Sequence, residues 1–133
     1  MTRYLDTQGT KAYLVACVAQ DPAHELENWT VQVRKGLLEL AVLSALSRDE
    51  QYGLEVLRRL QDVPGLEVQE GTLYPLLSRL RLQGLVRTRL EESAEGPARK
   101  YYALTREGRR ALEGMRAYVE ALVAGLRRLE EKR

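Results

Sequence analysis

The feature of this sequence that most constrains its fold is a change of hydrophobic period at Gly84. Before this glycine, leucines recur at the spacing of one helix face, at positions 73, 76, 77 and 80. After it, Val86, Thr88 and Leu90 alternate with charged residues, and the segment 100–104 alternates again. Alternation is typical of a strand with one buried face. The sequence therefore predicts a helix of about three turns, stopped by Gly84, and then a β-hairpin with a polar turn over 93–99.

Two helices are expected before this unit. Asp21 can cap a helix and Pro22 suits a first helical position, which predicts a helix over about 22–47. Its later half is apolar nearly all round, as expected at the centre of a core. A second helix is predicted over 52–60, followed by a Pro-Gly turn. Three helices followed by a hairpin is the order of a winged helix-turn-helix, an α+β fold that is mainly α.

The C-terminal segment predicts a dimerisation helix. Thr105 can cap a helix that continues to the end of the sequence, about 28 residues and about 40 Å long. Its apolar residues are spaced 3, 4, 3, 4 and 3 apart, as in a coiled coil, namely Leu112, Met115, Val119, Leu122, Leu126 and Leu129. An ordinary core-facing row is the alternative. The helix is too long to lie wholly against so small a domain, which favours pairing with a second chain.

Composition excludes several classes of function. The chain has 133 residues, with 21 basic and 19 acidic side chains and a net charge of +2, so overall charge does not indicate nucleic acid. The single cysteine, Cys17, and single histidine, His24, rule out an internal disulfide and a Cys/His metal cluster. No phosphate-binding loop or catalytic serine motif is found. No enzyme, cofactor, metal or catalytic residue is expected. The apolar run 12–19 is too short for a membrane span, and the expected location is the cytoplasm.

Local charge points to DNA. Residues 78–89 contain four arginines and no acid, a net charge of +4. The side of the third helix away from its leucines presents Glu70, Thr72, Tyr74, Ser78 and Arg81, with Arg79 at its border. These residue types bind phosphates and base edges. The alternative is a winged-helix module that binds protein rather than DNA. Such a module predicts an uncharged or acidic third helix with outward apolar residues, which the arginines oppose.

Four segments resemble one known family, the PadR transcriptional regulators. They are "KGLLELAVLSALS" (35–47), "YGLEVLRRL" (52–60), "EVQEGTLYPLLSRLRLQGLV" (67–86) and "GPARKYYALTREGRRAL" (96–112). The pairing of "GTLYPLLSRL" with "RKYYALTREG" about twenty residues later is specific to that family. The resemblance implies a homodimeric repressor of double-stranded DNA operators with a short C-terminal tail. It also implies release from DNA by small aromatic or drug-like ligands.

The resemblance assigns roles to residues of this sequence. It places the recognition helix at Gln69–Gln83 and the wing at Val86–Leu104. The resemblance and the position of side chains on the outer side of the third helix together predict the DNA-binding residues. These are Thr72, Tyr74, Pro75, Ser78, Arg79, Arg81, Arg99, Lys100 and Tyr101. Trp29 and Tyr118 are the candidate ligand-binding aromatics.

The chain is expected to divide into three parts. These are an N-terminal extension (1–30), the winged helix-turn-helix domain (31–104) and the dimerisation helix (105–133). The extension is expected to pack on the dimer, with a sensor appendage as the alternative.

Overall fold

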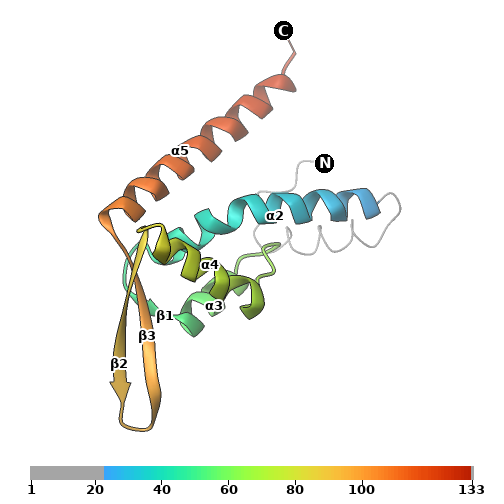
Figure 1. The fold of residues 1–133 in the computed structure, drawn as a ribbon. Coiled ribbons are helices and arrows are strands. Elements are labelled where there is room, and N and C mark those ends of the chain that lie inside the picture. The colour runs from blue at the N-terminus through green and yellow to red at the C-terminus, as the bar shows by residue number, and fades with distance from the viewer. Residues whose placement is uncertain (1–22, 133) are drawn as a thin grey trace.

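The computed structural model describes residues 23–132, and its chain order is helix, short strand, two helices, hairpin and long helix (Figure 1). This order confirms the predicted winged helix-turn-helix of the α+β class. The predictions for residues 1–22 lie outside the described residues. Helix α2, Ala23–Ala45, continues through position 30, where the predicted extension would end. The three-part division itself stays a prediction.

Helices α3, Gly53–Gln61, and α4, Glu70–Leu82, form the helix-turn-helix pair. Their bounds agree with the sequence-based prediction to within about two residues. Gly84 ends α4 with φ +80, a conformation that glycine adopts without a side-chain clash. Pro75 lies in the second turn of α4. The missing Pro75 N–H leaves one carbonyl without its helical donor, on a side of the helix that faces solvent.

Strands β2, Val86–Ser93, and β3, Gly96–Leu104, make the wing hairpin. The predicted polar turn over 93–99 is too long, because the strands continue to Ser93 and Gly96 and only Ala94 and Glu95 turn. A register shift between Glu91 and Ser93 accommodates Pro97, since bulges are where strands tolerate proline. The sequence analysis also missed β1, Gln51–Tyr52, which pairs with β3 and gives the sheet order β1-β3-β2.

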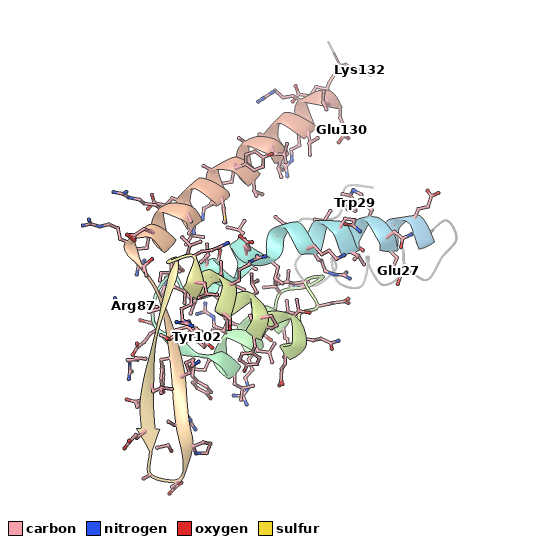
Figure 2. The ribbon with its side chains drawn as sticks, in the orientation of Figure 1. Glu27, Trp29, Arg87, Tyr102, Glu130 and Lys132 are labelled. Carbon is pink, nitrogen blue, oxygen red and sulfur yellow. The ribbon has the colours of Figure 1, made fainter. Side chains whose placement is uncertain are left out.

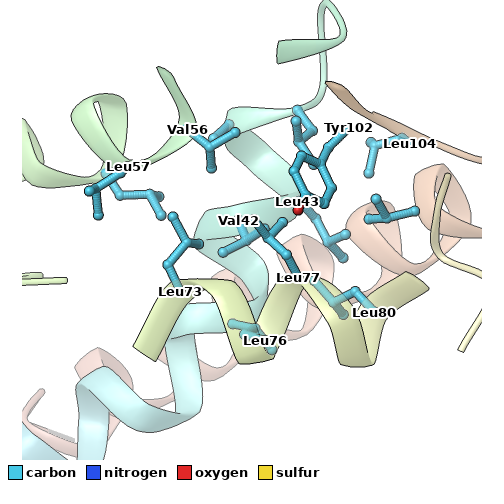
Figure 3. Packing of buried hydrophobic residues seen from close by; sticks show 14 of the residues in the cluster. Val42, Leu43, Val56, Leu57, Leu73, Leu76, Leu77, Leu80, Tyr102 and Leu104 are labelled. Carbon is cyan, nitrogen blue, oxygen red and sulfur yellow. The ribbon is translucent and has the colours of Figure 1, made fainter. Parts of the chain in front are cut away.

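The core is one cluster of apolar side chains between α2, α3, α4 and the base of the sheet (Figure 3). Leu73, Leu77 and Leu80 of α4 are fully buried there, and Leu76 is nearly so. They meet Val42 and Leu43 from the apolar half of α2, as its composition predicts. Fully burying a leucine stabilises the fold by about 1.5–3 kcal/mol, so these four leucines fix which side of α4 faces inward.

Helix α5, Arg106–Leu129, leaves the domain at an angle to α2, and the two helices diverge toward their far ends (Figure 1). Thr105 caps it, as predicted, by accepting a hydrogen bond from the Gly108 N–H at 3.0 Å. Of the predicted heptad residues, Leu112 is buried in the core and Met115 packs against it. Leu122, Leu126 and Leu129 are exposed. No helix in the described part of the chain is long and apolar enough to cross a membrane.

Gly108 is the point of closest approach between α5 and the start of the wing. A Cβ placed there would lie 2.0 Å from the Leu85 carbonyl oxygen, a backbone atom that cannot move aside easily. We therefore expect Gly108→Ala to lower the free energy of unfolding by about 1–3 kcal/mol, as overpacking does. Gly114→Ala in the same helix, where a Cβ meets nothing within 4 Å, is the matched control and is expected to leave stability unchanged or raise it. Equal urea midpoints for the two variants would contradict the close contact.

Candidate nucleic-acid interface

The exposed side of α4 is set by its buried leucines. At 100° per residue, Gly71, Pro75, Ser78 and Leu82 lie opposite the leucine face, and all four are exposed. Tyr74 and Arg81 occupy one flank, and Thr72 and Arg79 occupy the other. The predicted DNA-binding residues of this helix are therefore all on its surface, but on three different sides of it.

Tyr74 lies on the flank of α4 that faces α3. A Cβ on Gly53 would be 2.5 Å from a carbon of the Tyr74 ring, so the ring lies directly over that glycine. The prediction that Tyr74 is held away from the domain is wrong in this respect, because the lack of a side chain at Gly53 lets the ring pack there. Burial, with Glu70 nearby, raises the pKa of the Tyr74 phenol above its ordinary value. Its side chain remains 36% exposed, so its edge is still accessible.

Arg79 lies on the opposite flank and forms an ion pair with Glu39 of α2. Thr72 and Pro75 line the same shallow cleft between α2 and α4. Local sequence patterns do not predict this pair, since positions 39 and 79 are forty residues apart. Arg81 has no carboxylate within 4.0 Å among the described residues. Of the two arginines on α4, Arg81 is therefore the one with an uncompensated charge.

The wing separates residues that the sequence analysis grouped together. Successive side chains of a strand point to opposite faces. Lys100 shares the face of Tyr102, whose ring is buried in the core. Burial, with Tyr74 as a smaller cause, raises the pKa of the Tyr102 phenol, and Arg81 opposes this rise. Arg99 and Tyr101 lie on the other face. Of the three predicted wing residues, Lys100 is the one on the face of Tyr102.

The outer face of the wing carries a cluster that the sequence analysis missed. Arg89 of β2 donates hydrogen bonds to both carboxylate oxygens of Glu50, from its Nε at 3.0 and 2.9 Å and from Nη2. Its guanidinium also lies 4.6 Å from the centre of the Tyr101 ring. Tyr101 meets Tyr52 edge to face at 5.9 Å, and Arg99 lies over Tyr52 at 4.9 Å. The hydrogen bonds from Arg89 hold the pKa of the Glu50 carboxyl below its usual range.

The candidate ligand-binding aromatics, Trp29 and Tyr118, lie in one groove between α2 and α5. Trp29 is on the side of α2 toward α5 (Figure 2). The groove has a volume of about 700 Å³ and a mostly apolar lining that includes Val119, Leu122 and Leu126. Trp29 is 58% and Tyr118 69% exposed. The structure thus brings together residues that the sequence analysis named for two purposes, dimerisation and ligand binding.

Comparison with known proteins decides the family. A model of the Transcriptional regulator PadR-like family matches residues 42–114, more than half of the chain. The protein belongs to the PadR-like family of transcriptional regulators. This family is one of regulators rather than enzymes, which confirms the prediction that the chain is not an enzyme. In the part of the chain that the structure describes, no group of three or more side chains could hold a metal ion.

Three relatives illustrate the match. The Transcriptional regulator YqjI of Escherichia coli is 34% identical over 89 residues, 65% of this chain and 41% of its own length. The chain thus spans about two fifths of the curated relatives it matches. A crystal structure of a PadR family transcriptional regulator from Eggerthella lenta is 33% identical, with a TM-score of 0.75, and the match covers 86% of this chain and all of that one.

The third relative, a second solved structure, shows the same fold at lower identity. It is Bacillus subtilis PadR in complex with operator DNA, 23% identical with a TM-score of 0.56. The match covers 59% of this chain and 45% of that one.

Proposed function

We propose that this protein is a sequence-specific DNA-binding transcriptional regulator that acts as a homodimeric repressor. The observation that carries the proposal is that α4 packs directly beside β2 of the wing, so that the exposed side of α4 and the wing adjoin. Ser78 and Arg81 lie on the exposed side of α4, and Lys100 shares the wing face of Tyr102, whose pKa Arg81 acts to lower. Membership of a family of transcriptional regulators, one of which was crystallised with operator DNA, supports it.

The chemistry of the surface fits a duplex. Uncompensated cations such as Arg81 and Lys100 can neutralise phosphates and release counterions, which supplies most of the affinity for DNA. Ser78 and Thr72 hydroxyls, with the exposed edge of Tyr74, can bond phosphates or base edges. The tip of the wing carries Glu91, Glu92 and Glu95, which phosphates would repel. The base of the wing is therefore the part expected to meet the DNA backbone.

The dimer is inferred from the exposed apolar side of α5. Beyond Met115, the helix presents Leu122, Leu126 and Leu129, which are 48%, 52% and 81% exposed. Large contiguous apolar patches are rare on soluble monomers, and the heptad spacing of these leucines matches the geometry of a helix pair. A second copy of the chain is the partner that this face fits. Two copies would also present two α4 helices to a pair of operator half-sites.

Control by a small aromatic effector is part of the proposal. The α2–α5 groove has the volume and apolar lining of a small-molecule site, and Trp29 and Tyr118 can stack on a planar ring. A ligand there would touch the helices that form the proposed dimer. Purified protein is expected to show a ligand-dependent rise in melting temperature with planar aromatics, and Trp29→Ala is expected to abolish it.

The first test is DNA binding itself. Fluorescence anisotropy with DNA upstream of the protein's own gene is expected to give binding whose log Kd rises linearly with log salt. Arg81→Ala and Lys100→Ala are each expected to weaken it and to reduce the salt slope by about one. Arg128→Ala, an exposed arginine in the last turn of α5, is the control, because that end of the helix lies away from α4 and the wing (Figure 1). Binding to no DNA at low salt would favour the protein-interaction module instead.

Gly71 provides a second test because it sits in the first turn of α4. A Cβ there meets nothing within 4 Å, so Gly71→Ala is expected to stabilise the helix by up to about 0.5–1 kcal/mol. If the first turn lies against the DNA backbone, the same methyl group weakens operator binding. A melting temperature that rises together with a higher Kd is the predicted result. Unchanged affinity in the more stable variant would place the DNA elsewhere.

The dimer has a separate test. Changing Val119 and Leu122 to aspartate puts two charges into the apolar face of α5 and is expected to give monomers in sedimentation equilibrium. Operator binding is expected to fall in parallel. Aspartates at Ala117 and Ala124, on the opposite side of the same helix and exposed, are the matched control and should leave the dimer intact. A dimer that survives the first pair of changes would refute this interface.

A further inference from the structure

The three adjacent strands carry a row of side chains across the outer face of the sheet. The register pairs Arg89 of β2 with Tyr101 of β3, and Tyr101 with Tyr52 of β1. Because directly paired residues share a face, the three side chains stack in sequence. Glu50, immediately before β1, closes the row by binding both the Nε and an Nη of Arg89. The guanidinium thus reaches across β3 to a residue thirty-nine positions away.

The Glu50 end of this row is fixed to the body of the domain. Gln51 is only 6% exposed and donates a hydrogen bond to the Ala45 carbonyl at the end of α2, at 2.7 Å. Tyr52 occupies the N-cap position of α3, and its backbone N–H donates to the Glu55 carboxylate at 3.0 Å. Glu50 is therefore next to a segment that is bonded to both α2 and α3. Through Arg89, Glu50 links β2 to that segment.

The wing needs such a fixed point. A two-stranded ribbon is marginally stable by itself and twists strongly, so its direction depends on how its base is held. Beyond Leu90 and Lys100, most side chains of the wing are exposed and contribute little packing. A bidentate guanidinium–carboxylate pair has a defined geometry, and the stacked tyrosine restricts it further.

From these contacts we infer that Arg89 and Glu50 are positioning residues of the DNA-binding surface, which set the direction of the wing so that Lys100 reaches the DNA backbone. The inference rests on the proposed function. Arg89 itself is not a phosphate contact in this account. Its fork is occupied by Glu50, Glu91 lies 3.5 Å from its other Nη, and it lies on the face of the wing opposite to Lys100.

The alternative is that Arg89 contacts phosphate and leaves Glu50 when DNA binds. The two accounts predict opposite signs for Glu50→Gln. As a positioning residue, Glu50 is needed, so its loss weakens binding several-fold even though a negative charge is removed. If Glu50 instead competes with phosphate for Arg89, the loss of its carboxylate strengthens DNA binding. Glu92→Gln removes a carboxylate for which no ion pair is found among the described residues, and it measures the effect of charge alone.

Arg89→Lys separates geometry from charge. Lysine keeps the positive charge but lacks the planar fork and stacks less well, so it is expected to weaken binding as much as Arg89→Gln does. A phosphate contact would instead be largely preserved by lysine, and only glutamine would lower the salt slope by about one.

A double-mutant cycle between Glu50→Gln and Lys100→Ala completes the experiment, with anisotropy on the operator fragment and melting temperatures for every variant. In the Glu50→Gln background the wing no longer directs Lys100 to the DNA, so adding Lys100→Ala is expected to lower the affinity no further. The melting temperatures of all variants are expected to stay close to that of the wild type. Additive losses, tighter binding by Glu50→Gln than by Glu92→Gln, or preserved affinity in Arg89→Lys would each overturn the inference. Failure of the wild-type protein to bind DNA would instead refute the proposed function.

Discussion

The burial of four leucines of α4 against α2 and α3 is the interaction on which the rest of this structure depends. Leu73, Leu76, Leu77 and Leu80 take one side of the helix out of solvent, and this choice determines every other side. Ser78 and Pro75 face outward because the leucines face inward. Tyr74 and Arg81 turn toward α3 and the wing, whereas Arg79 turns toward α2 and its ion pair with Glu39. The candidate DNA-contacting surface is therefore a consequence of core packing.

The same packing positions the wing and α5. Gly84 ends α4 in a left-handed conformation, so β2 begins beside the helix, and Tyr102 returns from β3 into the core. Gly108 lets α5 approach the Leu85 carbonyl closely, after which the helix leaves the domain. The first apolar residues of α5 pack in the core, and the last ones are exposed. One helix thus serves the stability of the domain at its start and the proposed pairing with a second copy toward its end.

Local signals in the sequence were sufficient for the helices and the hairpin but not for contacts between distant segments. Hydrophobic period, Thr105 as a cap and Gly84 as a stop each act within a few residues, and the structure agrees with them. Strand β1 was missed because two residues carry no period, and its pairing with β3 depends on tertiary packing. The ion pairs Arg79–Glu39 and Arg89–Glu50 each join positions about forty residues apart. A count of arginines in 78–89 therefore overstated the charge available to DNA, since two of the four are compensated within the chain.

Hydrogen exchange of the protein with and without operator DNA tests most directly the claim that α4 and the base of the wing form the DNA-binding surface. The account predicts that DNA slows amide exchange in α4 and in the parts of β2 and β3 near Thr88 and Lys100. DNA is not expected to contact the exposed half of α5, so the exchange rates of its amides should be the same with and without DNA. Slowed exchange confined to α2, α3 or the tip of the wing, with α4 unchanged, would contradict it.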